Sequence, residues 1–172
     1  MADDATCEQC GFRWSAVTSD QIRDRLGFAT EAFIAVIKEA GQLGHVRPAS
    51  ERWSILEYGA HLRDVLISIR ERIVTASVVD EPIGQPMHRD ERVSLGLYKL
   101  DTPADVATEL RAMSGLFVRT FEALPPDFGR RQLTYSPLTA NKVTILWAAA
   151  QAVHECEHHL SDVRENLMHL VH

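Results

Sequence analysis

Residues 143–170 have the sequence VTILWAAAQAVHECEHHLSDVRENLMHL. Apolar residues recur in this stretch every three or four positions, which is the spacing of one face of an α-helix. The pattern predicts a long, regular final helix from near Val143 to about Leu170 that buries its apolar stripe against other helices. The stripe consists of Leu146, Ala149, Val153, Cys156, Leu160, Val163, Leu167 and Leu170.

The same spacing predicts three earlier helices. The first covers about residues 22–40 and ends at two nearby glycines. The second begins at the capping-box sequence SILE, residues 54–57, and continues to about Ala76. The third begins at the sequence DTP, residues 101–103, where a side-chain oxygen can cap the first turn, and Pro125-Pro126 ends it.

The connections between these helices define the fold class. Residues 79–100 form a connection far longer than the two to eight residues usual between neighbouring helices of a bundle. Residues 130–135 are predicted to be a short extended piece. We therefore predict an all-α fold, a four-helix bundle with a long crossover between helices two and three. The bundle would cover residues 19–172, after an N-terminal segment of residues 1–18 that contains a CxxC motif.

Composition excludes several classes of protein. The net charge of -6 and the pI near 5.7 leave no clustered cationic face for a nucleic-acid partner. No apolar run reaches the roughly 20 residues that cross a bilayer, and the chain opens with acidic residues, so no membrane partner and a cytoplasmic location are expected. Three cysteines favour reduced thiols or a metal over a disulfide framework. A homodimer is compatible with a bundle whose long regular final helix can pack a spare face on a second copy.

Two interleaved pairs of candidate metal ligands lie in the sequence HECEHH, residues 154–159. His154 and His158 are four residues apart, and so are Glu155 and His159, so either pair could place two donor atoms on one ion. Spacing alone does not choose between them. At about 100° per residue, Glu155 and His159 flank the apolar stripe, whereas the other pair projects from the opposite side.

A third candidate ligand, His61, lies on the second predicted helix beside apolar positions. One divalent cation would satisfy His61, Glu155 and His159 together, since buried polar groups are costly without partners. The alternative is a core histidine that hydrogen-bonds to a neighbour.

The sequence WSILEYGAHLRD, residues 53–64, resembles the second-helix signature of the DinB/YfiT-like superfamily, and residues 154–163 resemble its last-helix signature. This superfamily, which includes mycothiol-dependent maleylpyruvate isomerase, consists of four-helix bundles with one metal. The resemblance covers about residues 19–170 and implies ligands at His61, Glu155 and His159, followed by the polar residue Asp162. Glutamate replaces the commoner histidine at the first place of the last-helix pair, as in the isomerase. A register one residue earlier would instead give His61, His154 and His158.

Three protein ligands leave coordination places open, as in catalytic rather than structural sites. The resemblance implies that a low-molecular-weight thiol, of the mycothiol or bacillithiol type, reacts there with an electrophile in S-transfer or isomerisation. Zinc is the favoured metal, and nickel and iron accept the same ligands. No residue is assigned a catalytic step. The alternative is a non-catalytic metal-binding stress-response bundle that acts through a partner surface. The residues that could bind the thiol or its electrophile are Arg52, Arg89, Arg92 and Tyr98. The alternative is that they are plain surface charges.

The N-terminal motif Cys7-Glu8-Gln9-Cys10 is typical of half a zinc knuckle, because two thiolates around a tight turn bind one ion and need two more ligands. His154 and His158 could complete a closed Cys₂His₂ site. A free, flexible N-terminus and a redox-active dithiol are the alternatives. Cys156, within the apolar stripe, is predicted to be a small buried hydrophobe.

Overall fold

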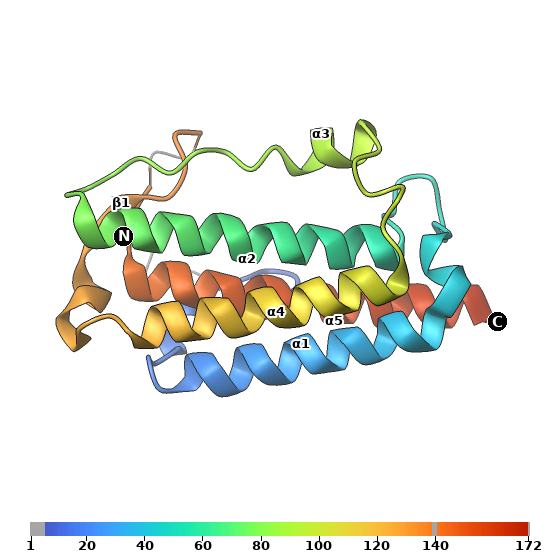
Figure 1. Ribbon diagram of the computed structural model, residues 1–172, viewed down its shortest axis with the longest axis horizontal. Helices are drawn as coiled ribbons and strands as arrows, with labels where there is room; N and C mark the ends of the chain where they lie inside the picture. Colours follow the sequence, from blue (N-terminus) through green and yellow to red (C-terminus); the bar gives the residue numbers. More distant parts are fainter. Residues whose placement is uncertain (1–5, 139–140, 172) are drawn as a thin grey trace.

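Four long helices pack around one core in the computed structural model, which describes residues 6–138 and 141–171 (Figure 1). This arrangement confirms the predicted all-α four-helix bundle with a long crossover. The long helices are α1 (Gln21–Ala40), α2 (Ile55–Val78), α4 (Pro103–Glu122) and α5 (Ile145–Val171). The shorter elements are α3 (Arg89–Ser94), the 3-10 turns η2 (Trp14–Ala16), η3 (Gly41–His45) and η4 (Pro126–Arg130), and the antiparallel hairpin of β1 (Gln132–Thr134) and β2 (Lys142–Thr144).

Most helix ends lie where local sequence signals predict them. The Ser54 hydroxyl accepts a hydrogen bond from the Glu57 N–H, and the Glu57 carboxylate accepts one from the Ser54 N–H, which completes the capping box of α2. Thr102 caps α4 in a similar way. One boundary was wrong, because Val143 pairs with Leu133 in the hairpin and α5 begins only at Ile145. The short helix α3 inside the crossover was not predicted.

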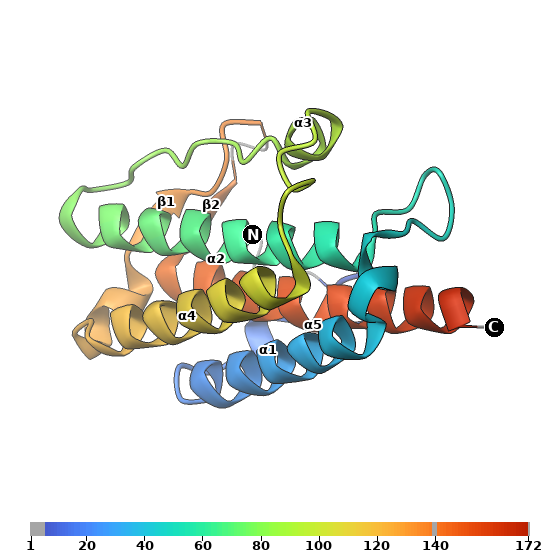
Figure 2. The same cartoon turned by 45° about the vertical axis from the view of Figure 1, so that its right-hand side comes forward.

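The direction of the helices explains the long crossover. Helices α2 and α4 run one way and α1 and α5 run the other way (Figures 1 and 2). Helix α2 packs against α4 and α5, and α1 packs against the same two helices. Because α2 and α4 are parallel neighbours, the chain must return along the whole of α2, about 36 Å for 24 residues. Residues 79–102 cover that distance.

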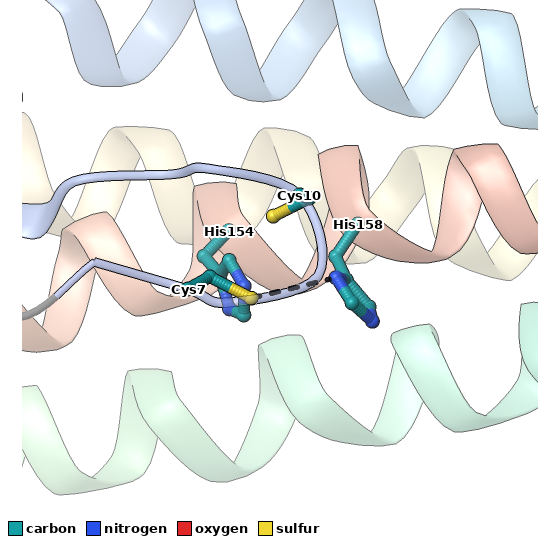
Figure 3. A group of neighbouring side chains, drawn as sticks. All are labelled: Cys7, Cys10, His154 and His158. Carbon is teal, nitrogen blue, oxygen red and sulfur yellow. Dashed lines mark hydrogen bonds between the residues drawn. The ribbon is translucent and has the colours of Figure 1, made fainter.

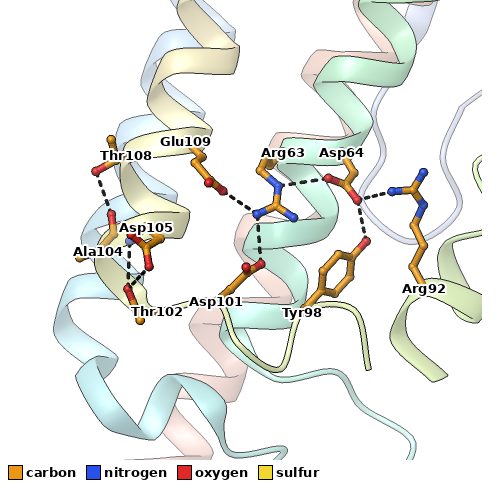
Figure 4. A network of polar contacts seen from close by, with 10 residues as sticks. All are labelled: Arg63, Asp64, Arg92, Tyr98, Asp101, Thr102, Ala104, Asp105, Thr108 and Glu109. Carbon is orange, nitrogen blue, oxygen red and sulfur yellow. Dashed lines mark hydrogen bonds and ion pairs between the residues drawn. The ribbon is translucent and has the colours of Figure 1, made fainter. Parts of the chain in front are cut away.

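Asp64 on α2 anchors the crossover (Figure 4). Its Oδ2 accepts hydrogen bonds from Arg92 Nη1 at 2.5 Å and from the hydroxyl of Tyr98 at 3.0 Å. Arg63 binds the other Asp64 oxygen and also Asp101, which lies two residues before α4. Arg92 and Tyr98, two of the residues predicted to bind the thiol or its electrophile, hold the crossover on α2 through these contacts, and their binding role stays a prediction. The neighbouring carboxylate supplies the partner that both groups need.

The N-terminal segment packs along α5. Phe12 and Val17 are buried with the bundle core, and Trp14 stacks on Trp147 with ring centroids 5.8 Å apart. Cys156 is fully buried in the apolar stripe, as its spacing predicts. Within the described ranges, no helix combines the length and apolar character needed to span a bilayer.

Gly59 lies where α2 leaves no room for a side chain beside its neighbours, and this makes a stability prediction possible. A Cβ at Gly59 would lie 2.7 Å from Val106 Cγ1 and 3.0 Å from Ile37 Cδ1. Gly59→Ala should therefore lower the free energy of unfolding by about 1–3 kcal/mol, since overpacking outweighs the gain in helix propensity. Gly27→Ala in α1, where a Cβ meets nothing within 4 Å, should raise it by about 0.5–1 kcal/mol. Chemical denaturation measures both, and a stabilised Gly59→Ala protein would contradict the packing described.

Candidate metal centre

Three side chains from α2 and α5 converge inside the bundle. The Nε2 atom of His61 lies 3.6 Å from Glu155 Oε2, and the Nε2 atom of His159 lies 3.4 Å from the same oxygen. One ligand atom from each residue lies within 4.8 Å of the other two. The separation of four residues between Glu155 and His159 puts both on the face of α5 that meets α2. The structure thus brings together the set that the sequence pattern favours.

The state of His61 indicates that this group fits a divalent cation. His61 is only 2% exposed, and neither of its ring nitrogens has a hydrogen-bond partner. A buried imidazole without partners is costly, and a metal ion would provide the missing interaction. Two imidazoles and one carboxylate form a donor set that zinc, nickel and iron all accept.

Surrounding polar groups fix the orientation of these ligands. Asp162 accepts a hydrogen bond from His159 Nδ1 at 2.7 Å, so the Nε2 atom faces Glu155. Gln151 donates to Glu155 Oε1 at 2.6 Å and accepts from the Trp14 indole at 2.7 Å. Oxygen Oε2 of Glu155 is therefore left for the two histidines. Gln151 was missed in the sequence, although its position one turn before Glu155 is a usable signal.

The protonation states of the three candidate ligands differ. Burial lowers the pKa of His61, which keeps the imidazole neutral. Burial opposes the charge of Glu155, but the neighbouring imidazoles of His159 and His61 outweigh it and lower the pKa of this carboxyl. Burial also opposes the charge of His159, yet Asp162 and Glu155 raise the pKa of His159 to about 8. Near neutral pH, only His159 must lose a proton before it can bind a metal ion.

Two cavities border the group of His61, Glu155 and His159. One, of about 520 Å³, is lined by His61 and Glu155 together with Arg72 and Tyr135. The other, of about 350 Å³, is lined by His159 and Asp162 among other residues. Both volumes are of the size that small-molecule sites have. The group is thus accessible to a small molecule although His61 itself is buried.

The arginines near these cavities differ in whether they line them. Arg89 lines both, whereas Arg52, another of the predicted ligand-binding residues, forms an ion pair with Glu165 at 2.8 Å. Arg72 was missed in the sequence; its guanidinium lies 4.4 Å from the centre of the Tyr135 ring. No local pattern marks Arg72 or Tyr135, because they meet only through the folding of the hairpin against α2.

The second ligand pair of α5 lies in a different cluster. His154 and His158 each offer a ligand atom within 4.8 Å of the sulfurs of Cys7 and Cys10. Across the described ranges, 6–138 and 141–171, the alternative set of His61, His154 and His158 does not come together as a group of this kind. The offset of one residue along the helix separates the two clusters.

Comparison with known proteins places this arrangement in a family. The model of the DinB superfamily matches residues 20–163. A similar solved structure is YfiT from Bacillus subtilis, described as a probable metal-dependent hydrolase with an unusual four-helix bundle topology. The two chains share 19% sequence identity over 87% of each, with a TM-score of 0.73, and this likeness shows the fold. No curated protein matches the chain. By its sequence over most of its length, the chain belongs to the DinB superfamily.

Proposed function

We propose that this protein is a metal-dependent enzyme in which His61, Glu155 and His159 bind one divalent cation beside the substrate cavity. The observation that carries the proposal is a group of three candidate ligands, largely buried and bordered by an accessible cavity. Three protein ligands are typical of catalytic sites, whereas structural zinc sites usually have four. In the described part of the chain, no fourth His, Cys, Asp or Glu joins this group. The description of YfiT as a probable metal-dependent hydrolase adds support.

Thiol transfer or thiol-dependent isomerisation is the reaction we favour, with a thiol of the mycothiol or bacillithiol type and an electrophile as substrates. A bound cation would lower the pKa of a thiol coordinated to it, so that the nucleophilic thiolate exists at neutral pH. Arg72 and Arg89 line the cavity and can donate hydrogen bonds to polar or anionic parts of either substrate. Gln151 and Asp162 keep Glu155 and His159 in position.

Hydrolysis is the second candidate, favoured by the likeness to YfiT. The two reactions differ in their nucleophile, and one comparison separates them. Metal-loaded protein is assayed with an aryl halide and each of glutathione, mycothiol and bacillithiol, and with a nitrophenyl ester in the absence of thiol. Turnover that requires a thiol favours transfer, and thiol-independent ester cleavage favours hydrolysis. If neither occurs with the metal bound, the enzymatic proposal fails and a non-catalytic metal protein remains.

Removal of one ligand tests the site itself. His159→Ala should lower metal affinity at this site and turnover by about 100-fold or more, since even loss of an outer hydrogen bond to a ligand costs about 10–100-fold. Asp162→Asn should fall within that smaller range. His169→Ala is the matched control, because His169 lies exposed on the same helix and its ion pair is with Glu165. Retention of metal and turnover by the His159→Ala protein would contradict the assignment.

The protonation of His159 predicts how metal binding depends on pH. Below its pKa of about 8, metal binding must displace the His159 proton. Affinity should therefore rise by about tenfold per pH unit up to about pH 8 and then level off. Asp162→Asn removes one of the charges that raise the pKa of His159, so the metal affinity of this variant should level off at a lower pH. Competition with a coloured chelator measures the affinity; a slope of zero below pH 8 would rule out His159 as the titrating ligand.

A further inference from the structure

A tight turn at the start of the described chain presents two thiols to α5. The Gly11 N–H donates to the Cys7 carbonyl, and the Cys7 N–H donates to the Phe12 carbonyl, each at 2.8 Å. Gly11 has a φ of +73°, a conformation that glycine adopts at little cost. Figure 3 shows both cysteines of this turn beside His154 and His158 of α5. The backbone thus brings two thiols to the second ligand pair.

The four side chains are close enough to share one ion. Their ligand atoms lie within 4.8 Å of one another, and the Cys7 sulfur is 3.9 Å from His158 Nδ1. These spacings come from residues more than 140 positions apart in the sequence, so they do not follow from local chain geometry. Two thiols and two imidazoles are the usual ligands of a structural zinc ion.

His154 supplies an independent observation. It is 91% buried, and neither of its ring nitrogens has a hydrogen-bond partner. The aromatic rings of Phe12 and Trp14 lie against it, with centroids 5.0 Å and 4.7 Å away. A buried imidazole with two unpartnered nitrogens is costly. A free segment or a redox-active dithiol would leave both nitrogens without a partner, whereas a metal ion would bind one of them and lower the cost.

We propose that Cys7, Cys10, His154 and His158 form a second, closed metal site that binds Zn²⁺ with four protein ligands. Binding replaces the two thiol protons, which pass to solvent, and leaves no coordination place for a substrate. The site would be structural and would hold the N-terminal segment on α5. The two sites share no residue, and this proposal does not depend on the reaction proposed for the first site.

Two contacts connect the proposed closed site to the first one. The segment that it holds carries Trp14, whose indole donates to Gln151, and Gln151 in turn donates to Glu155. His158 Nε2 also lies 4.0 Å from Asp162 Oδ2, the oxygen that accepts from His159. A metal ion on the cysteines would therefore help to fix the surroundings of the first triad without touching a substrate.

Cobalt reconstitution of the full-length protein under reducing conditions tests the site. The wild-type protein should bind about two equivalents of Co²⁺ and show the near-ultraviolet absorption of thiolate bound to cobalt. The double variant Cys7→Ser/Cys10→Ser should bind about one equivalent, lose that absorption and melt at a lower temperature. His61→Ala should also bind about one equivalent but keep the absorption. Cys156→Ala is the matched control and should keep both ions, because Cys156 is buried in the apolar stripe.

The proposal is overturned if the wild-type protein lacks thiolate–cobalt absorption, or if the double cysteine variant keeps both equivalents. Loss of the ion in His61→Ala with the absorption intact reports on the first site alone, so failures of the two proposals are distinguishable. If the cysteine variant does not fold, titration of the zinc-loaded wild-type protein with a mercurial reagent tests whether Cys7 and Cys10 bind zinc. Reaction of Cys7 and Cys10 should release about one equivalent of zinc; reaction without release overturns the site.

Discussion

An α-helix turns by about 100° per residue, so positions four apart share a face and adjacent positions do not. In α5 this constraint separates two pairs of candidate ligands that overlap in sequence. Glu155 and His159 meet His61 of α2, whereas His154 and His158 meet the N-terminal cysteines. Each pair is at least partly buried in a helix whose main stripe is apolar, and polar groups in such positions need partners. Other parts of the fold bring partners to these two pairs on two different faces of α5.

The bundle brings a partner to one face of α5, and the N-terminal segment brings partners to the other. Helix α2 packs on α5 and so brings His61 to Glu155, and the crossover that returns along α2 carries Arg89 to both cavities. Asp64 is central to this arrangement because it binds Arg92 and Tyr98 and thereby holds the crossover in place. The direction of the helices therefore has a chemical consequence: a long connection forced by parallel neighbours forms one wall of the candidate site.

Sequence predicted what depends on local periodicity. The four long helices and the cap at Ser54 follow from local spacing. The juxtaposition of the two pairs of candidate ligands on α5 with their partners is compatible with the same spacing, while their role as ligands stays a prediction. Contacts between distant segments did not follow. Arg72 and Tyr135 meet only after the hairpin packs against α2, and no sequence pattern shows that Arg92 contacts Asp64. Val143 was assigned to the last helix because strand pairing with Leu133 is invisible to periodicity.

Anomalous X-ray diffraction from zinc-loaded crystals, recorded above and below the zinc absorption edge, tests most directly whether α5 holds two separate ions. Two peaks are expected, one among His61, Glu155 and His159 and one among the two cysteines, His154 and His158. The same maps would show whether the first ion carries a non-protein ligand and the second has only protein ligands. A single peak, or one ion bound by His158, His159 and Asp162, which also lie close together, would contradict the two-site arrangement.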